Sequence, residues 1–254
     1  MKTLRRIKVE GFKSIQHAEL DFEDLNIIIG ANGSGKSNLI GVFRLLERVL
    51  SHNLQAYVGS EADRFLHHGR KTTPKLSIDF AFSRNSYGFE LVASQDTLIF
   101  ETERVEYDGH WKYAEPIGKG HKESVLEKAA VEARNKVPGF VLDVVKKIVV
   151  YHFHDVSDSS PAKRTCDVAD NRFFAKDGAN LPAYLYFLQE NHPHEFQIIQ
   201  EHIRLVAPFF ESFKLEPLRL NSEKIKLEWS HKGSEAYFDA FSLSDGTLRF
   251  MCLA

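Results

Sequence analysis

Cysteine and long apolar runs are both scarce in this sequence. The 254 residues include two cysteines, Cys166 and Cys252, and two thiols cannot build a disulfide framework. No apolar run reaches the roughly 18–20 residues that a membrane span needs. The opening residues, MKTLRRIKVE, carry no apolar segment behind their charges, unlike a signal peptide. We therefore expect a cytoplasmic protein with no membrane partner.

A strong charge of one sign is also lacking, because the net charge is about −2. The whole molecule is therefore not a polyanion binder. Basic residues do gather near the N-terminus, where Glu10 is the opposing acid. They are Lys2, Arg5, Arg6, Lys8 and Lys13. Such a cluster indicates either an edge strand protected by charge or a small patch for nucleic-acid phosphates.

The most informative stretch is LNIIIGANGSGKSNLIGVFRLLERVL, beginning at Leu25. Residues 25–29 form a short apolar run rich in β-branched side chains, which predicts a buried parallel strand. Residues 30–37 fit the phosphate-binding pattern G-x-x-x-x-G-K-[ST]. Apolar residues then recur at helical spacing. Strand, glycine loop and helix therefore follow in the order that a P-loop requires.

The residue types of this loop predict nucleotide binding. Gly30, Gly33 and Gly35 leave a concave path in which backbone N–H groups can surround a phosphate. Lys36 can reach the β- and γ-phosphates, and the Ser37 hydroxyl can bind Mg²⁺. The predicted nucleotide-binding residues are Gly30, Asn32, Gly33, Ser34, Gly35, Lys36, Ser37 and Asn38. Because no N-K-x-D guanine motif is present, ATP is the expected nucleotide.

The middle of the chain predicts antiparallel strands followed by helices. Residues 76–83 alternate cleanly, and three further alternating stretches up to residue 115 complete a predicted meander. A helix is expected over residues 121–136, closed by Pro138, and a second helical region over residues 181–208, broken at Pro193. Alternation at Ile225, Leu227 and Trp229 predicts another strand. The fold class is therefore α/β with antiparallel additions.

Residues 148–153 predict a buried strand that ends at His154 and Asp155. Asp155 could be the acid that supports Mg²⁺ at a strand end. His152 and His154 share one face of such a strand, as in some metal sites, although satisfied buried histidines are commoner. A nucleotide-sensing loop is a third interpretation. The residues themselves leave these alternatives open.

Residues 243–247, Leu-Ser-Asp-Gly-Thr, resemble the signature loop of ABC-type ATPases, whose family form is Leu-Ser-Gly-Gly-Gln. A serine hydroxyl and glycine N–H groups at a helix N-terminus can make a second anion site. Ser-Asp-Gly is also ordinary helix-cap chemistry. The resemblance implies that Ser244, Asp245 and Gly246 close over the ATP of a second subunit, and hence a homodimer through nucleotide-sandwiched heads.

The opening residues through the P-loop resemble the RecF/SMC-like branch of ABC-type ATPases. YHFHDVS, NLPAYL and LSDGTLRF are similar to bacterial RecF-like predicted AAA ATPases. The resemblance implies an ABC-type P-loop ATPase head with an antiparallel β-subdomain and a helical insertion. It implies an ATP-binding lobe over 1–150, a Gln-loop-like segment with the insertion over 151–212, and strands leading to the signature loop over 213–254. His154 and Asp155 correspond to the Gln-loop position.

One departure from the family pattern concerns catalysis. The family follows its signature helix with a strand ending in Asp-Glu and then a switch histidine, and this sequence stops at Ala254 before either. The resemblance therefore implies that the C-terminal part of the central sheet and the catalytic carboxylates are missing. We expect a truncated form, a fragment or half of a split protein, which does not fold autonomously.

The expected function is that of a Mg·ATP-binding N-terminal part of a RecF-like ABC-type ATPase. The resemblance implies that the whole protein dimerises on ATP and couples hydrolysis to an action on DNA or an effector protein, in DNA repair or phage defence. Two alternatives remain. One is a self-contained P-loop kinase or GTPase that uses Asp155, and the other is a non-catalytic nucleotide-gated scaffold.

Overall fold

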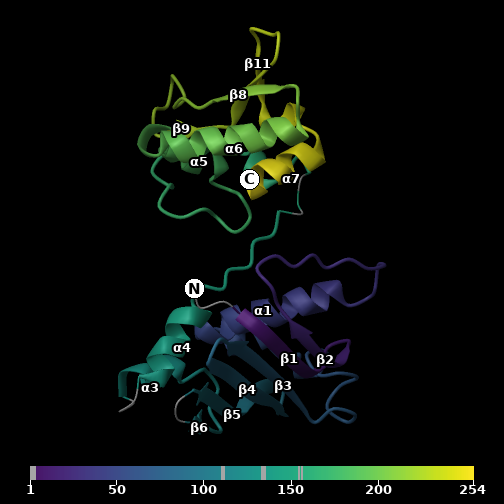
Figure 1. Ribbon diagram of the computed structural model, residues 1–254. Helices are drawn as coiled ribbons and strands as arrows, with labels where there is room; N and C mark the ends of the chain where they lie inside the picture. The colour runs from purple at the N-terminus through teal and green to yellow at the C-terminus, as the bar shows by residue number, and fades with distance from the viewer. Residues whose placement is uncertain (1–3, 110–111, 133–135, 154, 156) are drawn as a thin grey trace. The chain divides into compact units, whose positions relative to one another are not determined.

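The computed structural model describes residues 4–109, 112–132, 136–153, 155 and 157–254. The chain forms two compact units, Met1–Val150 and Tyr151–Ala254 (Figure 1). Each unit has its own apolar core. Within the described residues, every helix is too short or too polar to cross a membrane.

The first unit is an antiparallel sheet packed against helices. Its elements are β1 (Leu4–Phe12), β2 (Ile15–Asp21), α1 (Lys36–Leu50), α2 (Leu54–Val58), a 3₁₀ turn (Ala62–Arg64), β3 (Lys75–Phe82), β4 (Asn85–Ser94), β5 (Thr97–Asp108), β6 (Lys112–Gly118), α3 (Leu126–Glu132) and α4 (Val137–Val145). The strand order is β2-β1-β3-β4-β5-β6, and each neighbouring pair is antiparallel. The predicted meander is therefore confirmed.

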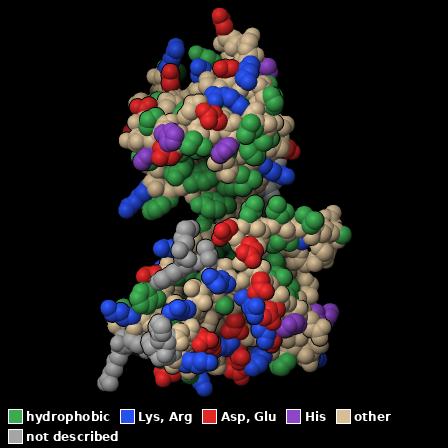
Figure 2. All heavy atoms as spheres, in the orientation of Figure 1, with side chains coloured by type: hydrophobic (Ala, Val, Ile, Leu, Met, Phe, Trp, Pro, Cys, Tyr) green, Lys and Arg blue, Asp and Glu red, His purple; other side chains and the backbone are tan. Residues whose placement is uncertain are grey.

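Alternation in β3 determines which face of the sheet is buried. Leu76, Ile78, Phe80 and Phe82 face the core, as predicted, and Phe80 meets Phe43 of α1 at a ring-centroid distance of 6.2 Å. The opposite face carries alternating acids and bases that form ion pairs, such as Lys75 with Glu90 and Arg104 with Asp79. Figure 2 shows acidic and basic side chains intermingled on this unit. The acidic and basic side chains on this face therefore compensate one another's charge.

A buried carboxylate joins the sheet to the start of α3. Glu103 on β5 is fully buried and accepts hydrogen bonds from the Tyr87 hydroxyl at 2.6 Å and the Ser124 hydroxyl at 2.5 Å. The backbone N–H of Val125 donates to the same carboxylate at 2.8 Å. Because a buried carboxylate is costly without donors, this network fixes the register of the segment that leads into α3.

Pro138 lies in the first turn of a helix, contrary to the prediction that it closes one. The helix predicted over residues 121–136 is observed as the shorter α3, and part of the remainder, residues 133–135, lies outside the described residues. Pro138 occupies the first turn of α4. A proline is tolerated there because the N–H groups of a first turn have no intrahelical partner.

The second unit combines two helices with short strands. Its elements are a 3₁₀ turn (Pro161–Lys163), β7 (Cys166–Asp167), α5 (Leu181–Asn191), α6 (Pro193–Val206), β8 (Phe210–Lys214), β9 (Lys224–Ile225), β10 (Glu228–His231), β11 (Tyr237–Asp239), a 3₁₀ turn (Ala240–Ser242) and α7 (Asp245–Leu253). One sheet has the order β11-β10-β8, and β7 pairs with β9 in another. The break at Pro193 is as predicted.

The strand predicted around Ile225, Leu227 and Trp229 is divided between two sheets. All three side chains are buried, so the predicted alternation is correct. However, Ile225 pairs with Cys166 of β7, whereas Trp229 pairs with Phe213 of β8 and Phe238 of β11. The alternating pattern identified the buried face, but strand partners distant in the sequence determined the sheets.

The strand predicted before the P-loop is not formed. Residues 25–29 have no strand pairing, and Leu25, Ile27 and Ile29 are 80%, 78% and 87% exposed. All strand pairs in the described part of the chain are antiparallel, so this part contains no parallel central sheet. A β-branched run forms a strand only when another strand satisfies its N–H and C=O groups.

The buried strand predicted over residues 148–153 is also not formed. This segment is irregular, and Val149 and Tyr151 are 44% and 46% exposed. The boundary between the two units falls within it, after Val150. An apolar run of this length fits an inter-unit segment as well as a strand, because periodicity alone does not distinguish them.

Candidate nucleotide-binding site

Two glycines with a left-handed backbone conformation determine the shape of the P-loop. Gly33 has φ 83° and Gly35 has φ 94°, a region in which a Cβ is strained. The carbonyl of Gly35 then accepts from the N–H groups of Asn38 at 2.9 Å and Leu39 at 3.0 Å, which begins α1 at Lys36. The glycine spacing of the motif thus places a tight turn directly at a helix N-terminus.

The backbone of this loop is suited to holding an anion. Ser34 donates its N–H to the carbonyl of Ala31, whereas in the described part of the chain the N–H groups of Asn32, Gly33 and Gly35 have no acceptor. A Cβ on Gly30 would lie 2.8 Å from the Ser34 hydroxyl and would narrow the loop. Free N–H groups at a helix N-terminus are a recurrent phosphate site, so the loop fits a nucleotide phosphate.

The predicted lysine and serine lie at this loop. The Lys36 ammonium donates to the carbonyls of Gly30 at 2.6 Å and Ala31 at 2.7 Å. Ser37, in the first turn of α1, is exposed. A phosphate oxygen can replace the two carbonyls as acceptor for Lys36, and the Ser37 hydroxyl is an oxygen ligand of the kind that Mg²⁺ prefers.

Ser14 is a site residue that the motif did not identify. Asn38 donates its side-chain N–H to the Ser14 hydroxyl at 2.6 Å, which ties the β1–β2 turn to the P-loop helix. A groove of about 430 Å³ runs beside both. It is lined by Ser14, Ile15, Gln16, His17, Ala18, Leu20, Ile28, Ile29, Gly30, Ser34, Gly35, Lys36 and Leu39. The residues Phe12-Lys13-Ser14, which form the turn between β1 and β2, are the only local sequence feature that accompanies this contact.

The three predicted site residues of the signature loop lie on the surface of the second unit. The Ser244 hydroxyl accepts from the N–H of Thr247 at 3.2 Å and lies 2.8 Å from the Thr247 hydroxyl, so it caps α7. Ser244, Asp245 and Gly246 are exposed. A Cβ on Gly246 would meet nothing within 4 Å. This chain therefore does not itself require glycine there, and the role in a partner's site remains a prediction.

Asp155 has local hydrogen-bond partners. Its carboxylate accepts from the N–H of Ser157 at 3.1 Å and from the Ser157 hydroxyl at 2.7 Å. His154 lies outside the described residues, so its predicted contacts are untested. Among the residues that the structure does describe, no three His, Cys, Asp or Glu side chains gather as metal ligands. The P-loop belongs to the first unit, whereas Asp155 and the signature loop belong to the second.

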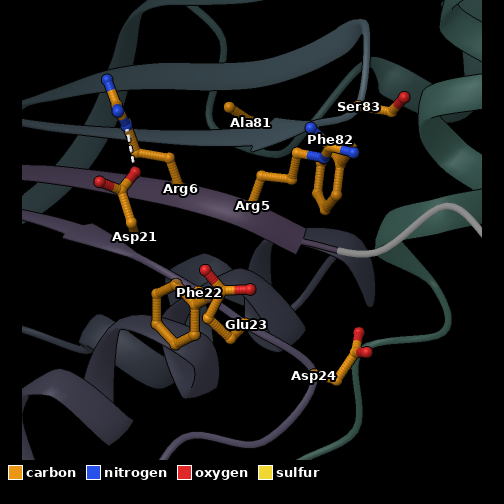
Figure 3. A pocket seen from close by; sticks show the side chains of 9 residues that line it. All are labelled: Arg5, Arg6, Asp21, Phe22, Glu23, Asp24, Ala81, Phe82 and Ser83. Carbon is orange, nitrogen blue, oxygen red and sulfur yellow. Dashed lines mark hydrogen bonds and ion pairs between the residues drawn. The ribbon is translucent and has the colours of Figure 1, made fainter.

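Another groove in the first unit is separate from the P-loop groove. It measures about 660 Å³ and is lined by Arg5, Arg6, Asp21, Phe22, Glu23, Asp24, Ala81, Phe82 and Ser83 (Figure 3). Arg6 donates to Asp21 at 2.6 Å across it. Because it shares no lining residue with the P-loop groove, we do not assign it to the nucleotide.

Two curated proteins are similar to parts of the chain. Urease accessory protein 2 of Cryptococcus neoformans var. grubii is 26% identical over 181 residues, which cover 69% of this chain. Structural maintenance of chromosomes protein 3 of Arabidopsis thaliana is 28% identical over 136 residues, 52% of this chain. The matches span 14% and 11% of the lengths of those proteins.

Two solved structures also resemble the chain. One, of an SMC ATPase studied for ATP-driven dimerisation and DNA-stimulated activation, is 17% identical with a TM-score of 0.31, over 58% of this chain and 85% of that one. The other is an SMC head bound to the C-terminal winged-helix domain of ScpA. It is 13% identical with a TM-score of 0.49, over 98% of this chain and 75% of that one.

A family model matches most of the chain. The model for the AAA ATPase domain covers residues 1–236, which include the whole P-loop. Its match agrees with the loop geometry, in which left-handed glycines, free N–H groups and Lys36 come together at a helix N-terminus. The chain therefore belongs to the AAA ATPase domain family and is a P-loop, ATP-binding ATPase domain.

Proposed function

We propose that this chain is the Mg·ATP-binding part of a RecF-like ABC-type ATPase head. The observation that carries the proposal is the P-loop, where the N–H groups of Asn32, Gly33 and Gly35 are free and Lys36 lies across the loop. A nucleotide would be held by its β-phosphate in this loop and by the Lys36 ammonium at the β- and γ-phosphates.

The Ser37 hydroxyl would hold Mg²⁺ in this site. When bound, Mg²⁺ supplies positive charge that neutralises the phosphate oxygens. Ser14 and Asn38 keep the β1–β2 turn against the loop, so residues on β2 flank the bound nucleotide. The residues of this chain therefore bind and orient the nucleotide.

The second part of the proposal is that two copies associate around ATP. Ser244 and Gly246 lie exposed at the N-terminus of α7, where a partner's γ-phosphate can approach backbone N–H groups. The carboxylate of Asp245 occupies the same turn, and we expect the bound cation to offset its repulsion of the phosphate. The resemblance to ABC-type heads supports this arrangement.

The output of such a head would be an action on DNA or on an effector protein in the cytoplasm. DNA repair and phage defence are the settings that the resemblance to RecF-like ATPases favours. The catalytic Asp-Glu pair of the family pattern would come from residues that follow the signature helix, or from another chain. Hydrolysis is accordingly proposed for the assembled protein.

Calorimetry with Lys36→Ala tests nucleotide binding. The substitution removes a charge-assisted hydrogen bond worth about 1.5–3 kcal/mol. ATP affinity should therefore fall roughly ten- to a hundred-fold. Lys128→Ala on α3 is the matched control. Lys128 is exposed, and its substitution removes the same charge elsewhere in the unit.

Equal ATP binding by the unsubstituted protein and Lys36→Ala would exclude the P-loop as the site. Hydrolysis assays on the 254-residue chain address the main alternative. Robust turnover abolished by Asp155→Asn would establish a self-contained P-loop enzyme in place of the proposed head.

Gly246→Arg tests the association in trans. Gly246 is exposed and its Cβ position is open, so arginine should fit the free subunit without disturbing the Ser244 cap. A bulky side chain there should block ATP-dependent dimerisation, measured by sedimentation of the assembled protein. ATP binding by the subunit itself should not change, because the loop serves the partner's nucleotide.

Glu235→Arg is the control, since Glu235 lies exposed in the loop between β10 and β11 of the same unit. Loss of subunit ATP affinity in Gly246→Arg, as large as in Lys36→Ala, would contradict the in-trans arrangement. So would ATP-dependent dimerisation that survives the substitution.

A further inference from the structure

A glycine leaves space beside the buried carboxylate of Glu103. In the antiparallel pairing of β5 with β6, the residue opposite Glu103 is Gly118. A Cβ on Gly118 would lie 2.4 Å from Nε2 of His121 and 2.7 Å from its Cδ2. The imidazole ring of His121, from the loop between β6 and α3, therefore occupies the place that a cross-strand side chain would fill.

The surroundings of His121 fix the orientation of its ring. Nδ1 lies 2.7 Å from the backbone carbonyl oxygen of Glu123, and because a carbonyl can only accept, Nδ1 carries a hydrogen and donates it. The ring stacks on Phe100 at a centroid distance of 4.5 Å and an interplanar angle of 24°. The N–H of Phe100 also donates to the carbonyl of His121 at 2.9 Å. The ring therefore cannot exchange the positions of its two nitrogens without losing these contacts.

The second ring nitrogen of His121 faces a carboxylate. Nε2 lies 3.5 Å from Oε2 of Glu103, and it is a buried polar atom without a hydrogen-bond partner among the described residues. A bare Nε2 would direct its lone pair towards a negatively charged oxygen, which is unfavourable away from water. A hydrogen on Nε2 turns the same contact into an ion pair. The geometry therefore favours an imidazolium with hydrogens on both nitrogens.

The hydrogen bonds to Glu103 favour a charged carboxylate rather than a protonated one. Its oxygens accept from the Tyr87 and Ser124 hydroxyls and from the N–H of Val125. Hydrogen bonds donated to a carboxylate favour its ionised form, and a buried charge needs a counter-charge. Within the described part of the chain, His121 is the basic side chain that lies within 4.0 Å of this carboxylate. The proton that the pair shares therefore belongs on His121.

The other titratable groups near the ring have different partners. Tyr87 on β4 meets Glu103 and not the imidazole. Glu123 presents its backbone carbonyl to Nδ1, whereas its carboxylate accepts from N–H groups of α2. Lys122, on the same loop, is exposed. Glu103 is therefore the charged group, among those described, that sets the charge of His121.

The loop that carries His121 also holds the start of α2. The carboxylate of Glu123 accepts from the N–H groups of Leu54 and Gln55, each at 3.0 Å, which have no acceptor within a helix because they lie in its first turn. The Gln55 side chain donates to the carbonyl of Lys122 at 2.7 Å. Because α2 follows α1 closely along the chain, this loop connects β5 to the end of the P-loop helix.

We propose that His121, doubly protonated in the folded protein, forms a pH-sensitive latch with Glu103. The imidazolium is the counter-ion of the buried carboxylate and holds residues 119–125 on the sheet, with Glu123 in place at the start of α2. When a rise in pH removes the Nε2 hydrogen, the carboxylate loses its counter-ion and the loop loosens. Stability from a group that is favoured in its protonated form is present at low pH and is lost as the pH rises. The latch does not depend on nucleotide binding.

NMR of the imidazole ring tests the charge of His121 in the unsubstituted protein. At about pH 7, where a histidine free in water is mostly neutral, both ring nitrogens of His121 should carry hydrogens and have the similar chemical shifts of an imidazolium. A neutral ring at that pH, with a bare Nε2, would overturn the proposal. This measurement needs no variant, so it decides the question even if a substitution at His121 prevents folding.

Amide hydrogen exchange of Leu54 and Gln55 tests whether the ion pair acts as a latch, because Glu123 protects both N–H groups. After correction for the intrinsic effect of pH on exchange, protection in the unsubstituted protein should fall roughly ten-fold between about pH 6 and pH 9, the size expected for losing one charged contact. His121→Gln keeps a polar side chain without the charge, so its protection should be low at both pH values.

His52→Gln is the matched control for His121→Gln. Nε2 of His52 lies 3.4 Å from the carboxylate of Glu127, but both side chains are 44% exposed. Because an exposed ion pair contributes little, this variant should keep the pH dependence of the unsubstituted protein. An equal fall in protection with pH in His121→Gln and in the unsubstituted protein would overturn the proposal, and so would loss of that fall in His52→Gln.

Discussion

Lysine side chains show how context sets the role of a residue. Lys36 donates to two loop carbonyls at the P-loop, Lys8 is neutralised by Glu10, and Lys13 packs on aromatic rings without an acidic partner. The same ammonium thus donates to loop carbonyls, forms an ion pair with a carboxylate or packs on aromatic rings. The difference lies in which acceptors the fold brings within reach.

The buried carboxylate of Glu103 makes a prediction at the residue scale. Tyr87→Phe removes one of its donors and leaves a buried charge less satisfied, which should cost about 1–3 kcal/mol of unfolding free energy. Burial and Glu103 also raise the pKa of Tyr87, so its hydroxyl remains a proton donor. Urea unfolding measures the loss.

Tyr57→Phe is the comparison, because Tyr57 is only partly buried and its hydroxyl has no partner among the described residues. Its unfolding free energy should change by less than about 0.5 kcal/mol. Similar costs for the two substitutions would show that the Glu103 network does not stabilise the fold.

Residues 25–29 are the segment where local pattern and observed structure differ most. Four of the five side chains are apolar and three of them are β-branched, yet they are exposed and the N–H and C=O groups of this segment have no strand partner. A strand from outside these 254 residues could pair on either edge, as the family resemblance implies. That pairing is a prediction.

Ile27→Asp tests the pairing at the element scale. In the 254-residue chain it should change the unfolding free energy by less than about 0.5 kcal/mol, because Ile27 is 78% exposed. Ile78→Asp, on buried β3, should unfold the first unit by burying an unpaired charge. Hydrogen exchange should show no protection for amides of residues 25–29.

For a longer or assembled form of the protein, we expect the opposite effect on stability and on amide protection. If a strand pairs there, Ile27→Asp should become strongly destabilising and the same amides should gain protection. Protection of these amides in the 254-residue chain alone would contradict the open segment seen in the structure.

At the scale of the whole molecule, two separate cores suggest two folding units. The first core includes Phe80 and the second includes Phe210, and both side chains are fully buried. We expect Phe80→Ala to lower the stability of the first unit by about 3–5 kcal/mol, and Phe210→Ala to do the same for the second.

Amide hydrogen exchange, measured separately in each unit, tests whether the two units unfold independently. Phe80→Ala should speed exchange in β3–β5 with little change in α5 and α6, and Phe210→Ala should do the reverse. Equal loss of protection in both units after either substitution would mean that they unfold as one cooperative body.

The sequence by itself determined the elements whose information is local. The P-loop pattern located the phosphate-binding loop because eight consecutive residues set its glycine conformations and its helix start. Alternation predicted the strands β3–β6, and in β3 also the buried face, because the strand period is two residues. The helix break at Pro193 could be predicted because proline has no backbone N–H to donate within a helix. Covalent geometry and short-range periodicity act within one segment, so these features need no distant partner.

Only the tertiary structure decided which groups found partners. Residues 25–29 and 148–153 both have strand-like composition, and neither forms a strand, because a strand needs a ladder of hydrogen bonds from another strand. The basic residues near the N-terminus looked like one patch, yet acids on the neighbouring strand neutralise Arg6, while α1 adds Arg44 beside Lys13. Hydrogen bonds and charges act through space, and a linear pattern does not record which side chains the fold brings within a few ångströms of one another.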